Sequence, residues 1–164
     1  MVSESRFRAA VPTVRCARVL IPATPLLATG SFGPRLGAPR VAGAIARGLQ
    51  AGGLPPPDLC PVDLAHEGVG EVRALLDACD FDTHMRRARA VILAERRLQE
   101  RLLEGSAAFE IATRARQAGV PAYAVTGENR LDPFDARMLD LQAIIEAGSA
   151  RALAAAGRKL ARLL

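Results

Sequence analysis

One short polar run, TGENRLD at residues 126–132, holds residue types that could bind a phosphate or an acid. It follows the apolar run AYAV at residues 122–125, which is typical of a buried strand. In an anion site, the glycine would give a tight turn, the arginine would contact the phosphate, and the acids would lie near Mg²⁺. An ordinary turn at the end of a strand would use the same residue types, so both interpretations remain open. The candidate residues are Gly127, Glu128, Arg130 and Asp132.

Apolar runs alternate with helical patterns along the chain, which indicates repeated strand–helix units. Short apolar runs predict strands at residues 18–22, 59–62, 89–95, 122–127 and 141–148. Apolar residues at helical spacing predict helices at residues 39–51, 67–80, 106–118 and 149–164, the last capped by Ser149. The Gly- and Pro-rich segment 23–39 is expected to be a loop, and segment 81–88 a linker.

This alternation predicts an α/β fold, a Rossmann-like three-layer sandwich with a mostly parallel sheet of about five strands and helices on both faces. We expect residues 1–17 to form a flexible N-terminal arm and residues 18–164 a single domain. Ligands of such folds bind beyond the carboxyl ends of the strands. The loops expected to hold a site therefore follow Pro22, Val62, Ala94 and Val125.

Composition narrows the class of partner. The chain of 164 residues carries a formal charge of +5, but its arginines are interspersed with acids and its only lysine is Lys159. This dispersed charge and an aromatic content of 4% argue against a nucleic-acid surface. No apolar run approaches the roughly 20 residues of a membrane span. We therefore expect a soluble cytoplasmic protein that binds neither nucleic acid nor membrane.

The cysteines and histidines do not indicate a metal site. Cys16, Cys60 and Cys79 are odd in number and lack Cys-x-x-Cys spacing, which favours reduced thiols over disulfides or zinc. His66 and His84 have no partners at metal-ligand spacing. We expect no bound metal at these residues, and the sequence makes no case for a reactive thiol.

The segment from residue 89 to residue 127 resembles the glycerate kinase family, the bacterial type that phosphorylates glycerate with ATP. Members read approximately D-L-V-I-T-G-E-G-R-L-D-x-Q-T-L-x-G-K-A-P, followed by a helix, G-V-P and a strand. Two earlier segments resemble family motifs in the same order, GSFGPRLG at residues 30–37 and PVDLAHEGV at residues 61–69. The main segment keeps Val91, Ile92, Glu95, Arg97, Leu98, Leu103, Gly105, Ala107 and the Gly119-Val120-Pro121 turn.

The resemblance implies the Rossmann-like half of a kinase, with the family's inserted second domain missing between residues 80 and 89. It implies ATP and Mg²⁺ as cofactors and a small organic acid, glycerate, as substrate. TGENRLD imitates the family's T-G-E-G-R-L-D but follows the G-V-P strand, one strand later than in the family. We therefore expect a turn there, with the anion site as the alternative. By resemblance, the phosphate- or substrate-binding residues are Ser31, Glu67, Gly68, Glu95, Arg97, Gly105 and Ser106.

The sequence departs from the family at charged positions. The family's two lysines align with Gly33 and Ser106, and two of its acids align with Gly30 and Leu64. Phosphoryl transfer needs positive groups or Mg²⁺ on the phosphates, so these losses predict that the chain alone transfers phosphate poorly. Three functions stay open. They are a kinase completed by a homo-oligomer or a partner subunit, a catalytically inactive binding or interaction module, and a decaying copy without a selected role.

Overall fold

A single parallel sheet organises the chain. The computed structural model describes residues 24–60, 69–99 and 106–164, and in these ranges five strands pair in the order β2-β1-β3-β4-β5. Every pairing is parallel, so the α/β prediction is confirmed, and this order is the one found in flavodoxin-type doubly wound sheets. The strands are β1 (Leu26–Thr29), β2 (Asp58–Cys60), β3 (Val91–Gln99), β4 (Ala122–Arg130) and β5 (Leu141–Glu146).

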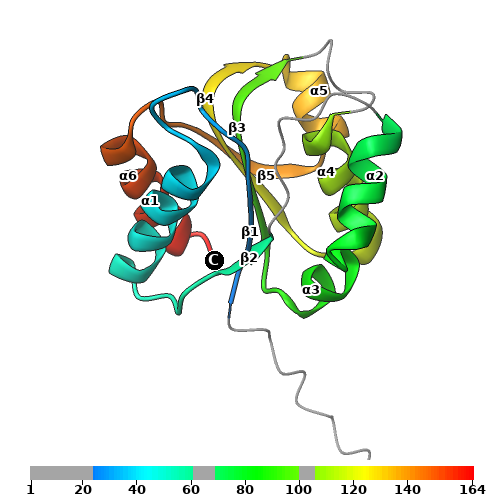
Figure 1. Cartoon of the computed structure of the whole chain (residues 1–164), viewed down its shortest axis with the longest axis horizontal. Helices are drawn as coiled ribbons and strands as arrows, with labels where there is room; N and C mark the ends of the chain where they lie inside the picture. The colour runs from blue at the N-terminus through cyan, green and yellow to red at the C-terminus, as the bar shows by residue number, and fades with distance from the viewer. Residues whose placement is uncertain (1–23, 61–68, 100–105) are drawn as a thin grey trace, which may run out of the picture.

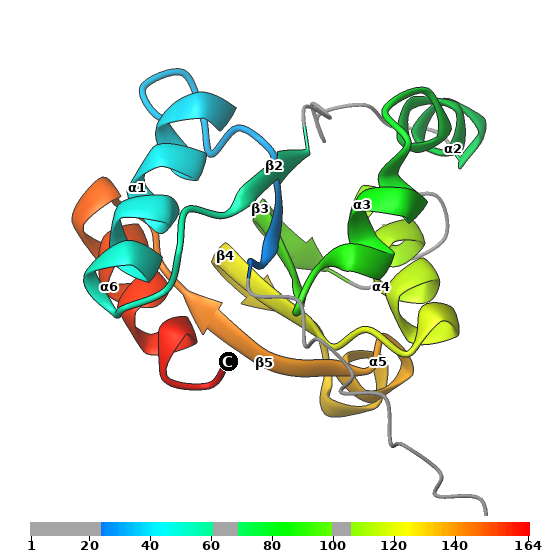
Figure 2. The same cartoon turned by 90° about the horizontal axis from the view of Figure 1, so that it is seen from below.

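Helices cover both faces of the sheet and complete the three layers (Figures 1 and 2). One face carries α1 (Ala38–Ala51) and α6 (Ala150–Ala161). The other carries α2 (Val69–Ala78), α3 (Phe81–Arg87), α4 (Ala107–Ala118) and the short α5 (Pro133–Met138). Two aliphatic clusters fill the spaces between these layers and the sheet. Of the described helices, none has the length and apolar character that a membrane span requires.

Most predicted elements are confirmed, including the Ser149 cap, whose side chain accepts from the Ala152 N–H. The expected loop at residues 23–39 is wrong, because β1 lies inside it. β1 has only four residues, all buried, and its hydrogen bonds go to β2 and β3, which are distant in sequence. The expected linker at residues 81–88 contains α3, and α5 was not predicted. The strand expected at residues 18–22 and the arm at residues 1–17 lie outside the described residues.

The layer of α1 and α6 depends on two glycines that let the helix backbones meet. A Cβ on Gly157 of α6 would lie 2.3 Å from the Ile45 carbonyl oxygen and 2.9 Å from the Gly48 Cα. A Cβ on Gly48 would lie 2.1 Å from the Ala154 carbonyl oxygen. Both clashes are with backbone, so neither helix can accept a larger residue here without moving apart.

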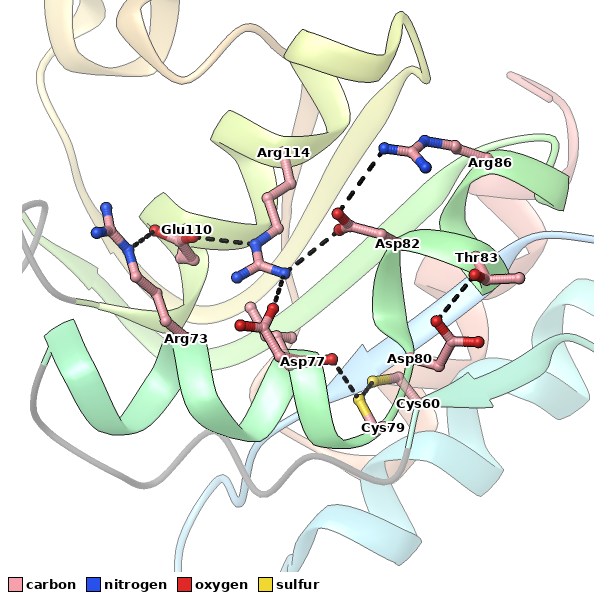
Figure 3. A network of polar contacts seen from close by, with 11 residues as sticks. Cys60, Arg73, Asp77, Cys79, Asp80, Asp82, Thr83, Arg86, Glu110 and Arg114 are labelled. Atoms are coloured by element: carbon pink, nitrogen blue, oxygen red, sulfur yellow. Dashed lines mark hydrogen bonds and ion pairs between the residues drawn. The ribbon is translucent and has the colours of Figure 1, made fainter.

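On the opposite face, Arg114 of α4 holds three helices together (Figure 3). Its Nη1 donates to Asp77 Oδ1 of α2 at 2.7 Å and to Asp82 Oδ1 of α3 at 3.4 Å, while its Nε donates to Glu110 Oε1 at 3.0 Å. Glu110 also accepts from Arg73 Nε at 3.1 Å. Burial lowers the pKa of Arg114, but its hydrogen bonds to Asp77 and Glu110 outweigh burial and the net shift is upward.

We expect Gly157→Ala to destabilise the protein by about 1–3 kcal/mol, because the new methyl group forces the helix backbones apart. Urea denaturation measures the change. Gly43→Ala is the matched control in α1: its Cβ would meet only the flexible Arg47 guanidinium at 3.5 Å. That change should stabilise the protein by about 0.5–1 kcal/mol through helix propensity. Equal effects of the two changes would contradict the close contact.

Replacing Arg114 with Leu should cost about 2–4 kcal/mol, because it leaves the largely buried Glu110 carboxylate with only the exposed Arg73 as its partner. Arg86→Leu is the control, since the Arg86–Asp82 pair is 3.9 Å long and exposed; it should stay within about 0.5 kcal/mol. Chemical denaturation at low and high salt distinguishes them. An Arg114 effect that disappears at high salt would show that its ion pairs are only surface contacts.

Candidate functional site

The polar run at residues 126–132 and the family-like residues Glu95 and Arg97 come together at the carboxyl edge of the sheet. β3 and β4 pair along their full lengths, with Glu95 opposite Thr126, Arg97 opposite Glu128 and Gln99 opposite Arg130. The turn expected at residues 126–132 is therefore wrong, because β4 continues to Arg130. Pairing with β3 extends both strands past Ala94 and Val125, where loops were expected.

Gly127 serves close packing within this ribbon. A Cβ there would lie 2.8 Å from the Arg96 carbonyl oxygen and 3.5 Å from the Phe32 ring. Phe32 comes from the loop after β1, so this loop reaches over β3 to β4. In the same loop, Ser31 Oγ bonds with the backbone of Gly33, whose φ of 127° favours glycine. The glycine at 127 thus provides a close approach between chain segments, and the tight turn expected there does not form.

Glu128 joins the two arginines of the ribbon. Its Oε2 accepts from Arg97 Nε at 2.7 Å, and its Oε1 accepts from Arg130 Nε at 2.5 Å. Hydrogen bonds from Arg97 and Arg130 hold the pKa of Glu128 below its ordinary value. Asp132 lies apart from this cluster as the N-cap of α5, where its Oδ1 accepts from the backbone of Phe134 and Asp135.

Glu95, two residues before Arg97 on β3, has the opposite environment. Its Oε1 accepts from the Ala108 N–H at 3.0 Å, at the start of α4. Burial raises the pKa of Glu95 to about 7, and this hydrogen bond offsets only part of the effect. Ser106 caps the same helix by accepting from the Phe109 N–H at 3.1 Å. The first turn of α4 therefore binds two side chains of its own chain.

A small cavity adjoins Glu95. Its volume of about 10 Å³ is enough for a single water. Its walls include Glu95, Arg97, Ser106, Leu131 and Leu139, so the structure brings three sequence-predicted residues together. Glu67, Gly68 and Gly105 lie outside the described residues.

Asp135 is a polar residue of this region that sequence reasoning missed. It lies on α5, is only 8% exposed, and its Oδ2 has no hydrogen-bond partner among the described residues. Because α5 was not predicted, nothing in the sequence indicated that this acid would be buried. The described ranges contain no group of three acidic, histidine or cysteine side chains that could hold a metal ion.

Comparison with known proteins establishes the family. The model of the glycerate kinase family matches residues 69–163, more than half of the chain. The chain therefore belongs to this family, and the resemblance noted in the sequence is confirmed. Curated proteins give no significant match. A crystal structure of a diflavin flavoprotein A3 from Nostoc sp. aligns with a TM-score of 0.46 and 17% identity, over 85% of this chain and 92% of that one. At this score the likeness carries no conclusion about function.

Glu95→Gln should reveal the raised pKa as a pH-dependent gain in stability. The folded pKa of about 7 exceeds the ordinary 4.5, so the folded state binds more protons than the unfolded state between these values. The stability that protonated Glu95 provides is fully present below pH 4.5 and is lost as pH rises through 7. Glutamine keeps the acceptor for Ala108, so the variant should exceed wild type by about 2–3 kcal/mol at pH 8 and approach it near pH 4.5.

Glu128→Gln is the control for this titration. Its folded pKa is lowered, so its contribution is present above its ordinary pKa and is lost only as pH falls through the folded value. The difference between Glu128→Gln and wild type should therefore stay constant from pH 5.5 to pH 8. Urea denaturation across this pH range gives both curves. If the difference in stability between Glu95→Gln and wild type does not change with pH over this range, Glu95 ionises at its ordinary pKa.

Proposed function

We propose that this member of the glycerate kinase family supplies one half of a site that phosphorylates a small hydroxy acid of the glycerate class. The observation that supports the proposal is the state of Glu95, a carboxylate at the carboxyl edge whose pKa burial raises to about 7. A base with a pKa near the working pH is suited to accept a proton from a substrate hydroxyl. A cytoplasmic location, where ATP is present, belongs to the proposal.

ATP and Mg²⁺ do not fit the described residues by themselves. These residues offer no three-ligand metal group, and the Ala108 N–H of α4 is taken by Glu95. Arg97 and Arg130 are both paired with Glu128. Lys159 lies on α6, in the layer on the other face of the sheet from α4. The proposal therefore assigns phosphate binding to a second surface, either another copy of this chain or a partner subunit.

In this half-site the domain binds the carboxylate of the hydroxy acid and accepts the proton of its hydroxyl group. Arg97 and Glu95 line the same cavity, whose volume of about 10 Å³ is too small for an organic acid, and Arg97 is already paired with Glu128. The carboxylate of the substrate would replace Glu128 on Arg97, because the guanidinium donates hydrogen bonds to either carboxylate. The substrate hydroxyl would then give its proton to Glu95 as its oxygen bonds the γ-phosphorus of ATP and the bond from that phosphorus to the leaving ADP breaks.

A specific observation favours a second candidate function, a catalytically inactive binding or interaction module. A helix N-terminus is a natural phosphate site, but in α4 the chain's own Glu95 and Ser106 take the N–H groups of Ala108 and Phe109. The lysines that the family would provide are glycine and serine here. A domain with this arrangement would keep the family's fold and pair with another protein without turning over ATP.

A coupled ADP-release assay with ATP, Mg²⁺ and D-glycerate, run over a range of protein concentrations, separates the two functions. The half-site predicts turnover that needs glycerate and whose rate per chain increases with protein concentration. Glu95→Gln should lower this rate by about 10²-fold or more, because glutamine cannot accept the proton. Glu71→Gln, an exposed acid on α2, should keep the wild-type rate.

The controls decide between the candidates. Glycerate-dependent turnover that Glu95→Gln leaves intact would reject Glu95 as the base. Absence of turnover at every concentration, in a sample with a cooperative unfolding transition, would reject the half-site of identical chains. If a candidate partner subunit also fails to restore turnover, the inactive module and the decaying copy remain.

A further inference from the structure

Two cysteines that are distant in sequence lie in contact where the edge strand β2 meets the end of α2. Cys60 ends β2 and Cys79 follows α2, and their Sγ atoms are 3.5 Å apart (Figure 3). A disulfide has an S–S distance of about 2.05 Å, so the two sulfurs are one short movement from bonding distance. Cys79 Sγ also lies 3.3 Å from the Leu76 carbonyl oxygen, which holds its side chain beside Cys60.

The thiol pair lies in a cavity of about 270 Å³ whose other walls are Leu59, Phe81 and His84. Leu59 is 54% exposed and the His84 side chain 49% exposed, so two walls reach the surface. Cys79 is itself half-buried, while Cys60 is buried. A small reagent can therefore meet Cys79 first, with Cys60 directly behind it.

We propose that Cys60 and Cys79 form a reversible dithiol–disulfide centre that reacts with low-molecular-weight disulfides. The Cys79 thiolate attacks one sulfur of the small disulfide, forming a mixed disulfide and releasing one thiol. The Cys60 thiolate then attacks Cys79 Sγ, forming the Cys60–Cys79 bond and releasing the second thiol. The two cysteines lose two electrons, the small disulfide gains them, and the two cysteine protons end on the released thiols.

The bond would fasten an edge strand to the helical layer. β2 has three residues and pairs only with β1, among the described strands. At its start, Asp58 Oδ2 already bonds His84 Nδ1 of α3 at 2.6 Å. A Cys60–Cys79 bond would add a covalent link to the end of α2 at the other end of β2. Oxidation therefore stabilises this edge of the domain, independently of any phosphoryl transfer at β3 and β4.

The test uses the full chain with Cys16→Ser, which leaves Cys60 and Cys79 as its only thiols. The folded protein is incubated with increasing ratios of oxidised to reduced glutathione and then alkylated. Its intact mass is measured by mass spectrometry. We expect one transition to a species that lacks two hydrogens, carries no alkyl group and no glutathione, and yields a cross-linked peptide. This species should unfold about 5–10 °C above the reduced form, and dithiothreitol should reverse both changes.

Single substitutions test the order of attack. Cys60→Ser in the same background should accumulate a stable glutathione adduct on Cys79, because the second thiol is absent. Cys79→Ser should form its adduct on the buried Cys60 at least about tenfold more slowly, since access limits exchange. Two results with the Cys16→Ser protein would contradict the proposed dithiol–disulfide centre. One is a glutathione adduct that never converts to the Cys60–Cys79 cross-link, and the other is no reaction while the protein is folded. Unchanged melting after cross-linking would overturn the stabilising link to β2.

Discussion

The pairing of β3 with β4 beyond the ends of their neighbours is the constraint on which the candidate site depends. β1 leaves the sheet opposite Ala94 and β5 leaves it opposite Thr126, but the central pair continues to Gln99 and Arg130. Most side chains of this ribbon are exposed or half-buried, so it tolerates charges that the sheet interior would exclude. Its parallel register brings together two polar runs that are about thirty residues apart in sequence.

Two glutamates of the ribbon show how strongly position decides chemistry. Glu128 is exposed between two guanidinium groups, which hold its pKa low. Glu95 lies one strand away under α4, where burial raises its pKa to about 7 and one backbone N–H compensates only in part. The same side chain is thus a permanent counter-ion in one place and a titrating group in the other. Ser106 caps α4 just before Ala107, and this start of the helix places the Ala108 N–H within hydrogen-bond distance of Glu95.

The sequence predicts what is periodic and local, and the structure adds what depends on distant partners. The longer helices and the apolar halves of β3 and β4 follow from their patterns. β1 could not be recognised, because the four residues between Pro25 and Gly30, three of them apolar, become a strand only through hydrogen bonds to β2 and β3. For the same reason TGENRLD suggested a turn: its continuation as a strand comes from Glu95–Gln99 alongside it. Contact between Cys60 and Cys79 had no sequence signal either, since it depends on where β2 and α2 end.

Arginine has two roles in this chain that conflict with phosphate binding. Arg114 is engaged by acids from three helices, and Arg97 and Arg130 are engaged by one acid on the ribbon. The formal charge of +5 therefore overstates the positive potential available to a ligand. An anion arriving at Arg97 must displace Glu128, whose low pKa reflects the strength of the pairing it would lose. A ligand that brings a carboxylate can replace this interaction in kind, whereas triphosphate binding would require more positive charge than Arg97 and Arg130, both paired with Glu128, leave available. This competition is the physical reason for our proposal that the domain binds the hydroxy acid and not the nucleotide.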